Sequence, residues 1–138
     1  MTLVVYFDRS SAILNIVNKY QKEFEASVYQ IEPTESITFF TKLKNEKVNI
    51  KKCNLNLMSY DKIILISSLW HNEVPSPVIR FLEQNVGKIK SITYVLYNNN
   101  KEDKPLEFDK MDRILNLKRD KSFFVTINRK EINVRVYQ

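Results

Sequence analysis

Short apolar runs alternate along the chain with stretches in which apolar residues recur every three or four positions. A continuous apolar run bounded by polar residues is typical of a buried strand, whereas the wider spacing is typical of an amphipathic helix. The apolar runs predict strands at Thr2–Phe7, Ser27–Ile31, Lys62–Ser67 and Ser91–Tyr97. Most of the chain therefore alternates strand with helix.

The stretches between and after these strands predict four helices. The second runs from about Thr34 to Glu46, and we expect a loop over residues 47–59, which show no clear period. The apolar positions that carry the helical spacing are Ile13, Ile16, Val17, Tyr20 and Phe24 in the first helix, Ile37, Phe40 and Leu43 in the second, Val78, Phe81, Leu82 and Val86 in the third, and Phe108, Met111, Ile114 and Leu115 in the fourth.

The carboxyl-terminal end has a different pattern. Residues Ser122–Ile127 and Glu131–Tyr137 predict two strands around the turn at 128–130. The complete order of strands and helices predicts an α/β fold: a mostly parallel five-stranded sheet between two helical layers, with an extra antiparallel strand at one edge. We expect residues 1–138 to form a single domain.

Composition narrows the class of protein. The single cysteine, Cys53, excludes an internal disulfide framework and any multi-cysteine metal site. The amino terminus lacks the pattern of a signal peptide and no apolar run has the length of a membrane span, so we expect a cytoplasmic protein without membrane contact. The net charge of +6 permits binding to polyanions. Nucleic acid is nevertheless disfavoured as a partner, because no helix-turn-helix, zinc or RNA-recognition signature accompanies the charge.

The loop after the third strand is the best candidate for a ligand site. It contains the only tryptophan, Trp70, and lies where open α/β sheets bind ligands, at the carboxyl end of a strand. Ser76 and Pro77 predict the start of the following helix, with Ser76 as its N-cap and Pro77 as its first residue.

Three segments resemble the flavodoxin family over roughly the first 100 residues. Residues 3–11 (LVVYFDRSS) are similar to the family's first strand and phosphate loop. Residues 68–78 (SLWHNEVPSPV) are similar to the stretch beside the flavin ring, and residues 95–100 (VLYNNN) stand where the family has a Thr-Ser-Gly-Gly turn. The resemblance implies a three-layer α/β/α sandwich with strand order 2-1-3-4-5, which is the order given for flavodoxin itself, and FMN as cofactor.

The resemblance also implies which residues surround the cofactor. The phosphate would meet the start of the first helix, Trp70 would stack on the isoalloxazine ring, and backbone groups near Asn72 and residues 98–100 would meet its polar edge. The candidate cofactor-binding residues are Arg9, Ser10, Ser11, Ala12, Ser68, Leu69, Trp70, His71, Asn72, Tyr97, Asn98 and Asn99.

The phosphate loop departs from the family pattern. Where the family has Thr-Gly-Asn-Thr, this chain has Ser10-Ser11-Ala12-Ile13, so the loop glycine is replaced. Asp8 adds a negative charge close to the expected phosphate. At the ring end, Asn72 is a residue type that tolerates the left-handed conformation, which predicts that this loop keeps its shape without glycine.

Two functions follow from these observations. The first is an FMN-binding protein in electron transfer or flavin-dependent reduction, with a flavin or a redox protein as partner. The alternative is a flavodoxin-like scaffold without cofactor that acts through protein contacts, in which Trp70 covers the core, Ser10 is an ordinary N-cap and His71 lies on the surface. In either case the carboxyl-terminal strand replaces the family's last helix, which leaves an edge through which the chain can associate with a partner or with itself.

Overall fold

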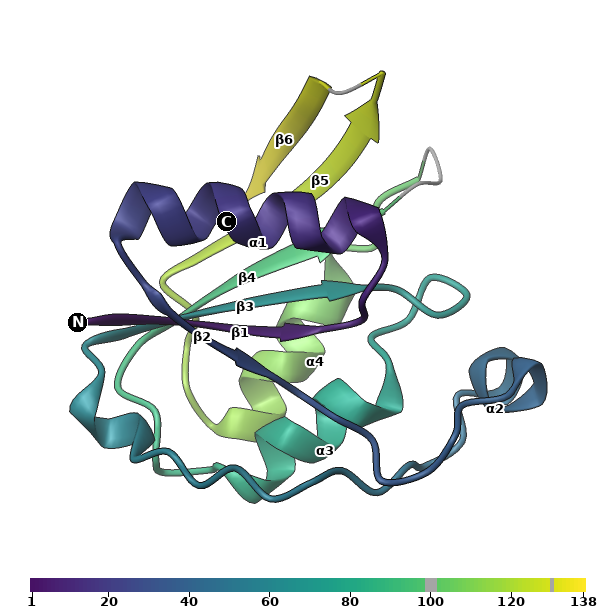
Figure 1. The fold of residues 1–138 in the computed structure, drawn as a ribbon, viewed down its shortest axis with the longest axis horizontal. Helices are drawn as coiled ribbons and strands as arrows, with labels where there is room; N and C mark the ends of the chain where they lie inside the picture. The colour runs from purple at the N-terminus through teal and green to yellow at the C-terminus, as the bar shows by residue number, and fades with distance from the viewer. Residues whose placement is uncertain (99–101, 130) are drawn as a thin grey trace.

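The computed structural model describes residues 1–98, 102–129 and 131–138 and shows an α/β sandwich (Figure 1). Strands form where apolar residues are continuous, and most helices form where apolar residues recur every three or four positions. The strands are β1 (Thr2–Phe7), β2 (Ser27–Gln30), β3 (Lys62–Ser68), β4 (Ile92–Tyr97), β5 (Lys121–Asn128) and β6 (Glu131–Tyr137). The helices are α1 (Ser11–Phe24), α2 (Phe39–Lys44), α3 (Ser76–Gln84) and α4 (Leu106–Leu115), with a 3-10 turn η1 at Leu57–Ser59.

The strands form one sheet in the order β2-β1-β3-β4-β5-β6. The first five strands are parallel and β6 runs antiparallel to β5, which confirms the predicted fold class and strand order. Figure 1 shows α1 on one face of the sheet and α3 and α4 on the other. The carboxyl ends of the parallel strands therefore lie together at one end of the molecule, next to α2.

Each face of the sheet has its own core. On the α1 side, Ile13, Ile16 and Val17 of the helix pack on Val4, Ile64, Ile66, Val95 and Val125 of the strands. On the other side, Val78, Phe81 and Leu82 of α3 and Phe108 and Met111 of α4 cover the sheet. Full burial of one such side chain contributes about 1.5–3 kcal/mol to the free energy of unfolding. The central strands are therefore stable, and the loops that follow them start from fixed positions.

The second helix differs from the prediction. It covers only Phe39–Lys44, and none of its residues is buried. Phe40 and Leu43, which the spacing predicted to face the core, are 66% and 46% exposed. The helix is short because the chain before it pairs with residues 49–51: the Thr34 N–H donates to the Asn49 carbonyl, and Pro33 bridges Ile50. Helix formation starts only at Thr38, whose Oγ1 accepts from the Thr41 N–H.

The start and end of α3 also differ from the prediction. Pro75 occupies the N-cap position, Ser76 is the first helical residue and Pro77 the second. Ser76 does not cap the helix, because its hydroxyl donates to the Glu46 carbonyl. Val86 lies beyond the end of α3 and is 47% exposed, so it is not part of the apolar face. In the part of the chain that the structure describes, no helix combines the length and the apolarity that crossing a bilayer requires.

Candidate functional site

A cavity of about 420 Å³ lies at the carboxyl ends of β1, β3 and β4. Its size falls in the range of about 300–1,000 Å³ that is typical of small-molecule sites. Three loops meet around it, because parallel strands of one sheet end at the same edge. The cavity is lined by Asp8, Ser10, Ser11, Ala12, Lys42, Ser68, Leu69, Trp70, His71, Asn72, Tyr97 and Asn98.

The structure brings nearly all of the predicted cofactor-binding residues together around this cavity. Two are exceptions. Arg9 does not line it and instead borders an adjoining hollow of about 250 Å³, which shares Asp8, Lys42 and Trp70 with the main cavity. Asn99 lies outside the described residues. Whether the ten residues at the cavity bind a cofactor remains a proposal.

The loop between β1 and α1 forms one wall. Asp8 has a φ of 89°, a left-handed conformation that favours glycine, and its carboxylate accepts from the Arg9 N–H at 2.7 Å. Ser10 is the N-cap of α1, and its Oγ accepts from the Ile13 N–H at 3.3 Å. Ile13, which replaces a family threonine, is fully buried in the core. The helix start is therefore intact, but a carboxylate stands beside it.

The loop between β3 and α3 forms a second wall as a tight turn. Trp70 and Glu73 exchange two backbone hydrogen bonds, of 2.8 and 3.0 Å, across His71 and Asn72. These two central residues have φ values of 48° and 66°, the left-handed pair that such a turn requires. The predicted left-handed conformation of Asn72 is confirmed, and His71, an exposed residue, shares it.

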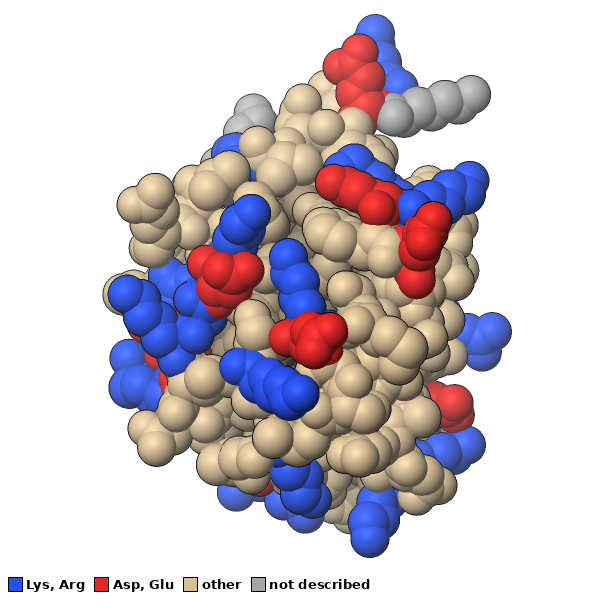
Figure 2. Space-filling model, turned by 90° about the vertical axis from the view of Figure 1, so that its left-hand side faces the viewer, with Lys and Arg blue, Asp and Glu red and all other residues tan. Residues whose placement is uncertain are grey.

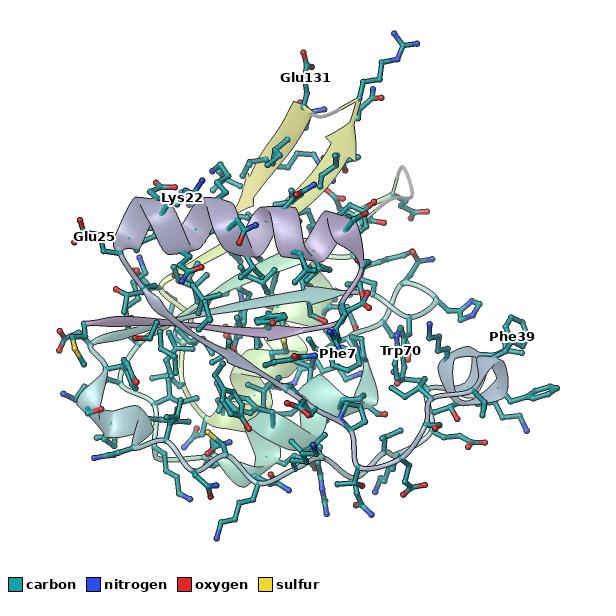
Figure 3. All side chains as sticks on the ribbon, viewed as in Figure 1. Phe7, Lys22, Glu25, Phe39, Trp70 and Glu131 are labelled. Atoms are coloured by element: carbon teal, nitrogen blue, oxygen red, sulfur yellow. The ribbon has the colours of Figure 1, made fainter. Side chains whose placement is uncertain are left out.

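Trp70 lies between the cavity and the core. Its side chain is only 6% exposed and packs edge-on against Phe7, with ring centroids 5.7 Å apart. Figure 3 shows Trp70 between the β3–α3 loop and α2, with Phe7 next to it at the end of β1. Trp70 therefore covers the core and lines the cavity at once, so the two interpretations of this residue are not exclusive.

The loop after β4 forms the third wall. Asn98 is buried, and its side-chain amide donates to the Glu102 carbonyl at 2.7 Å and to Asp103 at 3.2 Å. Asp103 also accepts from Arg135 and from the Tyr137 hydroxyl of β6, both at 2.7 Å. The Arg135 guanidinium, together with the Tyr137 and Asn98 donors, lowers the pKa of Asp103. Strand β6 thus holds the loop that positions Asn98.

Lys42 is the cavity residue that sequence reasoning missed. It comes from α2, which is linked to the β3–α3 loop by Asn45: the Asn45 amide donates to the Val74 carbonyl at 2.9 Å, and its Oδ1 accepts from the Ser76 N–H at 2.8 Å. These contacts hold the end of α2 beside the cavity. Lys42 thus adds a cation to a cavity lining that also contains the Asp8 carboxylate. No spacing in the sequence marks it among the many lysines of the chain.

The described residues contain no group of three or more histidine, cysteine, aspartate or glutamate side chains that could hold a metal ion. On the face shown in Figure 2, basic and acidic side chains are interspersed rather than gathered by sign. That distribution is typical of a solvated surface.

Comparison with solved structures identifies the architecture. A protein from Bacteroides uniformis, named as a flavoprotein, matches with a TM-score of 0.76 at 15% identity, over 94% of this chain and 92% of that chain. A second, from Bacteroides eggerthii and named likewise, has a TM-score of 0.75 at 17% identity, over 89% and 86% of the two chains. A flavoprotein from Lactobacillus acidophilus, solved in complex with FMN, has a TM-score of 0.71 at 14% identity over 91% of each chain.

The chain has the flavodoxin-like fold. At these identities the similarity concerns the fold alone, and it confirms the three-layer sandwich that the sequence predicted. No protein-family model matches the chain, and the search of curated proteins found no match.

Proposed function

We propose that residues 1–138 act as one flavodoxin-like domain that binds FMN in the cavity at the ends of β1, β3 and β4. The observation that supports this proposal most is that the three sequence segments resembling flavodoxin form the walls of one cavity. The flavoprotein from Lactobacillus acidophilus, whose structure is similar to that of this chain, has been solved in complex with FMN. The role would be electron transfer or flavin-dependent reduction, with a redox protein as partner.

The wall formed by the start of α1 fits a phosphate group. No acidic residue occupies the first turn of α1, and the backbone N–H groups and dipole of a helix start attract anions. Ser10 and Ser11 add hydroxyls, and Lys42 adds a positive charge at the same cavity. Asp8 opposes them with one negative charge. The hydrogen-bond donors and the cation outnumber the single Asp8 carboxylate, so this wall suits a phosphate group. We expect the phosphate to bind less tightly than it would if Asp8 were uncharged.

The opposite wall fits an aromatic ring system. Trp70 and Tyr97 line the cavity, and the backbone of the tight turn at His71 and Asn72 supplies polar groups at its rim. Because Trp70 is only 6% exposed, the part of its ring that a flavin can contact in this conformation is small. A bound flavin would supply the redox chemistry, while these residues would orient it and exclude water from one side.

The test is a titration of the purified protein with FMN, followed by quenching of flavin fluorescence, with riboflavin as the ligand that lacks phosphate. Two lysines of α2 provide a matched pair of variants: Lys42 lines the cavity, whereas Lys44 does not. We expect Lys42→Ala to weaken FMN binding by about three- to tenfold, because it removes a cation whose attraction for a phosphate near the protein surface is on the order of 1 kcal/mol. Lys44→Ala should leave FMN affinity unchanged, and neither variant should affect riboflavin.

The alternative is a scaffold without cofactor that acts through protein contacts. The specific observation in its favour is Asp8, whose carboxylate already accepts the Arg9 N–H beside the helix start that would hold the phosphate. A functional cofactor site would be saturated well below an FMN concentration of roughly 500 µM. If no saturable binding were seen up to that concentration, the flavin proposal would be rejected. A partner captured equally well by the Trp70→Ala variant would then support the scaffold.

A further inference from the structure

The two edges of the sheet are built differently. Strand β2 has only four residues, and beyond it the chain around Pro33 pairs with residues 49–51 of the same chain. Strand β6 has seven residues, contains no proline or lysine, and is the outermost strand. Natural proteins protect open edges with short strands, proline or lysine, because an unpaired edge binds other strands. Strand β2 has this protection and β6 lacks it.

The hydrogen-bond pattern shows which backbone groups of β6 face outward. The Val125 carbonyl accepts from the Asn98 N–H on the β4 side, so the backbone groups of Val125 point away from β6. Val134 is the residue opposite Val125, and their pair is therefore a non-hydrogen-bonded one. The N–H and C=O of Val134 consequently point to the open edge, as do those of Ile132 and Val136 two residues away on either side.

The side chains of β6 divide into two faces. On one face Arg135 and Tyr137 bond to Asp103 and so belong to the body of the protein. The other face carries Ile132, Val134 and Val136, next to Phe123 and Ile127 of β5, and Val134 and Val136 are 40% and 65% exposed. Figure 1 shows the β5–β6 hairpin extending past α1, so this apolar row continues the buried face beyond the helix that covers it.

We propose that β6 pairs antiparallel with β6 of a second copy of this chain, around a two-fold axis at Val134. Val134 is the middle residue of the strand, and an axis through it lets the whole of Glu131–Tyr137 pair. Its outward-facing N–H and C=O then bond to the same groups of the partner, which extends the sheet across the dimer.

The sequence of β6 is complementary to itself in this register. Val134 faces Val134 of the partner subunit, and Ile132 faces the partner's Val136, so the apolar rows join into one surface. Glu131 and Arg135 are the two charged residues of the strand. In this register Glu131 lies diagonally across from the partner's Arg135, which is attractive, and the two copies of Arg135 lie at the same diagonal separation, each already paired with its own Asp103. The apolar match of Ile132, Val134 and Val136 with their own copies is therefore what favours a second copy over an unrelated strand.

The net charge of +6 on each chain acts against the dimer. Repulsion between two such chains is screened by salt, whereas apolar contacts and backbone hydrogen bonds are little affected. The dimer should therefore become tighter as NaCl is raised from about 50 to about 500 mM. A polyanion contact would show the opposite dependence. One strand pair makes a small interface, so the association should be weak and concentration-dependent.

The first experiment is sedimentation velocity of the full chain from about 10 to about 500 µM, the range expected for a weak interface. Val134→Lys places two lysines opposite each other and should weaken association at least about tenfold. The matched control is Val28→Lys in β2, because Val28 is similarly exposed, at 43%, on the other edge of the sheet. Far-UV circular dichroism checks that both variants are folded.

A second experiment tests the register and does not need the lysine variant to fold. In a Cys53→Ser background, Val134→Cys should form an intersubunit disulfide under mild oxidation, because directly opposite hydrogen-bonded residues have Cα atoms about 5.5 Å apart. Val136→Cys should not, since the two copies of that position are offset by four residues, roughly 14 Å along the strands.

A mass near twice 16.4 kDa, lost in Val134→Lys and kept in Val28→Lys, supports the proposal. A monomer at every concentration overturns it, and so does a dimer that Val134→Lys leaves intact. Equal crosslinking of the Val134→Cys and Val136→Cys variants overturns the register.

Discussion

Two loops of the cavity have residues in the same left-handed backbone conformation but differ in the charge of those residues. Both adopt left-handed conformations without glycine: the β3–α3 loop at His71 and Asn72, the β1–α1 loop at Asp8. In the first, the two left-handed positions carry an imidazole and an amide, so neither adds a carboxylate. In the second, a carboxylate stands beside the start of α1. Both loops therefore hold a left-handed backbone without glycine, and they differ in the charge of the side chain at that position.

The size of each electrostatic contribution indicates how strongly the Asp8 carboxylate would affect the binding of an anion. A helix start favours an anion by about 0.3–1 kcal/mol. A full charge at contact distance near a protein surface acts with about 1–4 kcal/mol, which exceeds the helix contribution. Lys42 is a full charge of the opposite sign at the same cavity. The charge at the cavity therefore depends on Asp8 and Lys42. The following variants compare the loop that contains Asp8 with the loop that contains Trp70 and His71.

The largest effect is expected at Trp70. Trp70→Ala removes a buried ring that packs on Phe7, so we expect the free energy of unfolding to fall by about 3–5 kcal/mol. Urea denaturation measures it. Phe40→Ala is the control, because that ring is 66% exposed, and it should change stability by less than about 0.5 kcal/mol. Equal costs for the two variants would show that Trp70 is not a core residue.

Asp8 is expected to give the next largest effect. Asp8→Gly removes both the charge and the strained φ of 89°, so we expect a gain of about 1 kcal/mol in stability and roughly tenfold tighter FMN binding. Asp8→Asn removes the charge alone and should tighten FMN binding with little change in stability. Fluorescence titration and urea denaturation measure the two quantities. If riboflavin binding tightened as much as FMN binding, Asp8 would not act on the phosphate.

Ser10 tests whether the helix start contributes on its own. Ser10→Ala removes the N-cap bond to the Ile13 N–H and should cost about 1 kcal/mol of stability. It also removes one hydroxyl from the phosphate end, so FMN should bind about threefold more weakly while riboflavin is unaffected. Ser10→Thr keeps the oxygen and should restore both. A loss of stability in Ser10→Ala without any change in FMN affinity would leave Ser10 as a cap alone.

The fold was predictable because its signal is local. The apolar runs and helical spacings gave every strand and the order of elements, and the parallel order placed the three loops at one edge. The long helix predicted over 34–46 was wrong for a tertiary reason. The spacing of Ile37, Phe40 and Leu43 is that of an amphipathic helix, but Thr34 pairs with Asn49 and leaves only six helical residues.

The position of the site was predictable because the loops after parallel strands lie together at one edge of the sheet. Lys42 could not be predicted, since α2 reaches the cavity through the contacts of Asn45 with Val74 and Ser76, which are about 30 residues further along the chain. The sequence left open whether Trp70 covers the core or contacts a ligand, because a residue after the end of a strand has no periodicity to assign its side. Phe7, at the end of the neighbouring strand, determines it.

The smallest effect is expected at His71, and it separates backbone strain from charge in the comparison of the two loops. His71→Gly relieves a left-handed φ of 48° at an exposed position, so we expect a gain of about 0.5–1 kcal/mol in the free energy of unfolding, comparable to that of Asp8→Gly. FMN affinity should stay unchanged, because no charge near the phosphate is altered. Asn56→Gly is the control: its φ is −82°, so glycine there should lower stability by a few tenths of a kcal/mol. If His71→Gly tightened FMN binding as Asp8→Gly does, relief of backbone strain rather than loss of charge would account for the effect of Asp8→Gly.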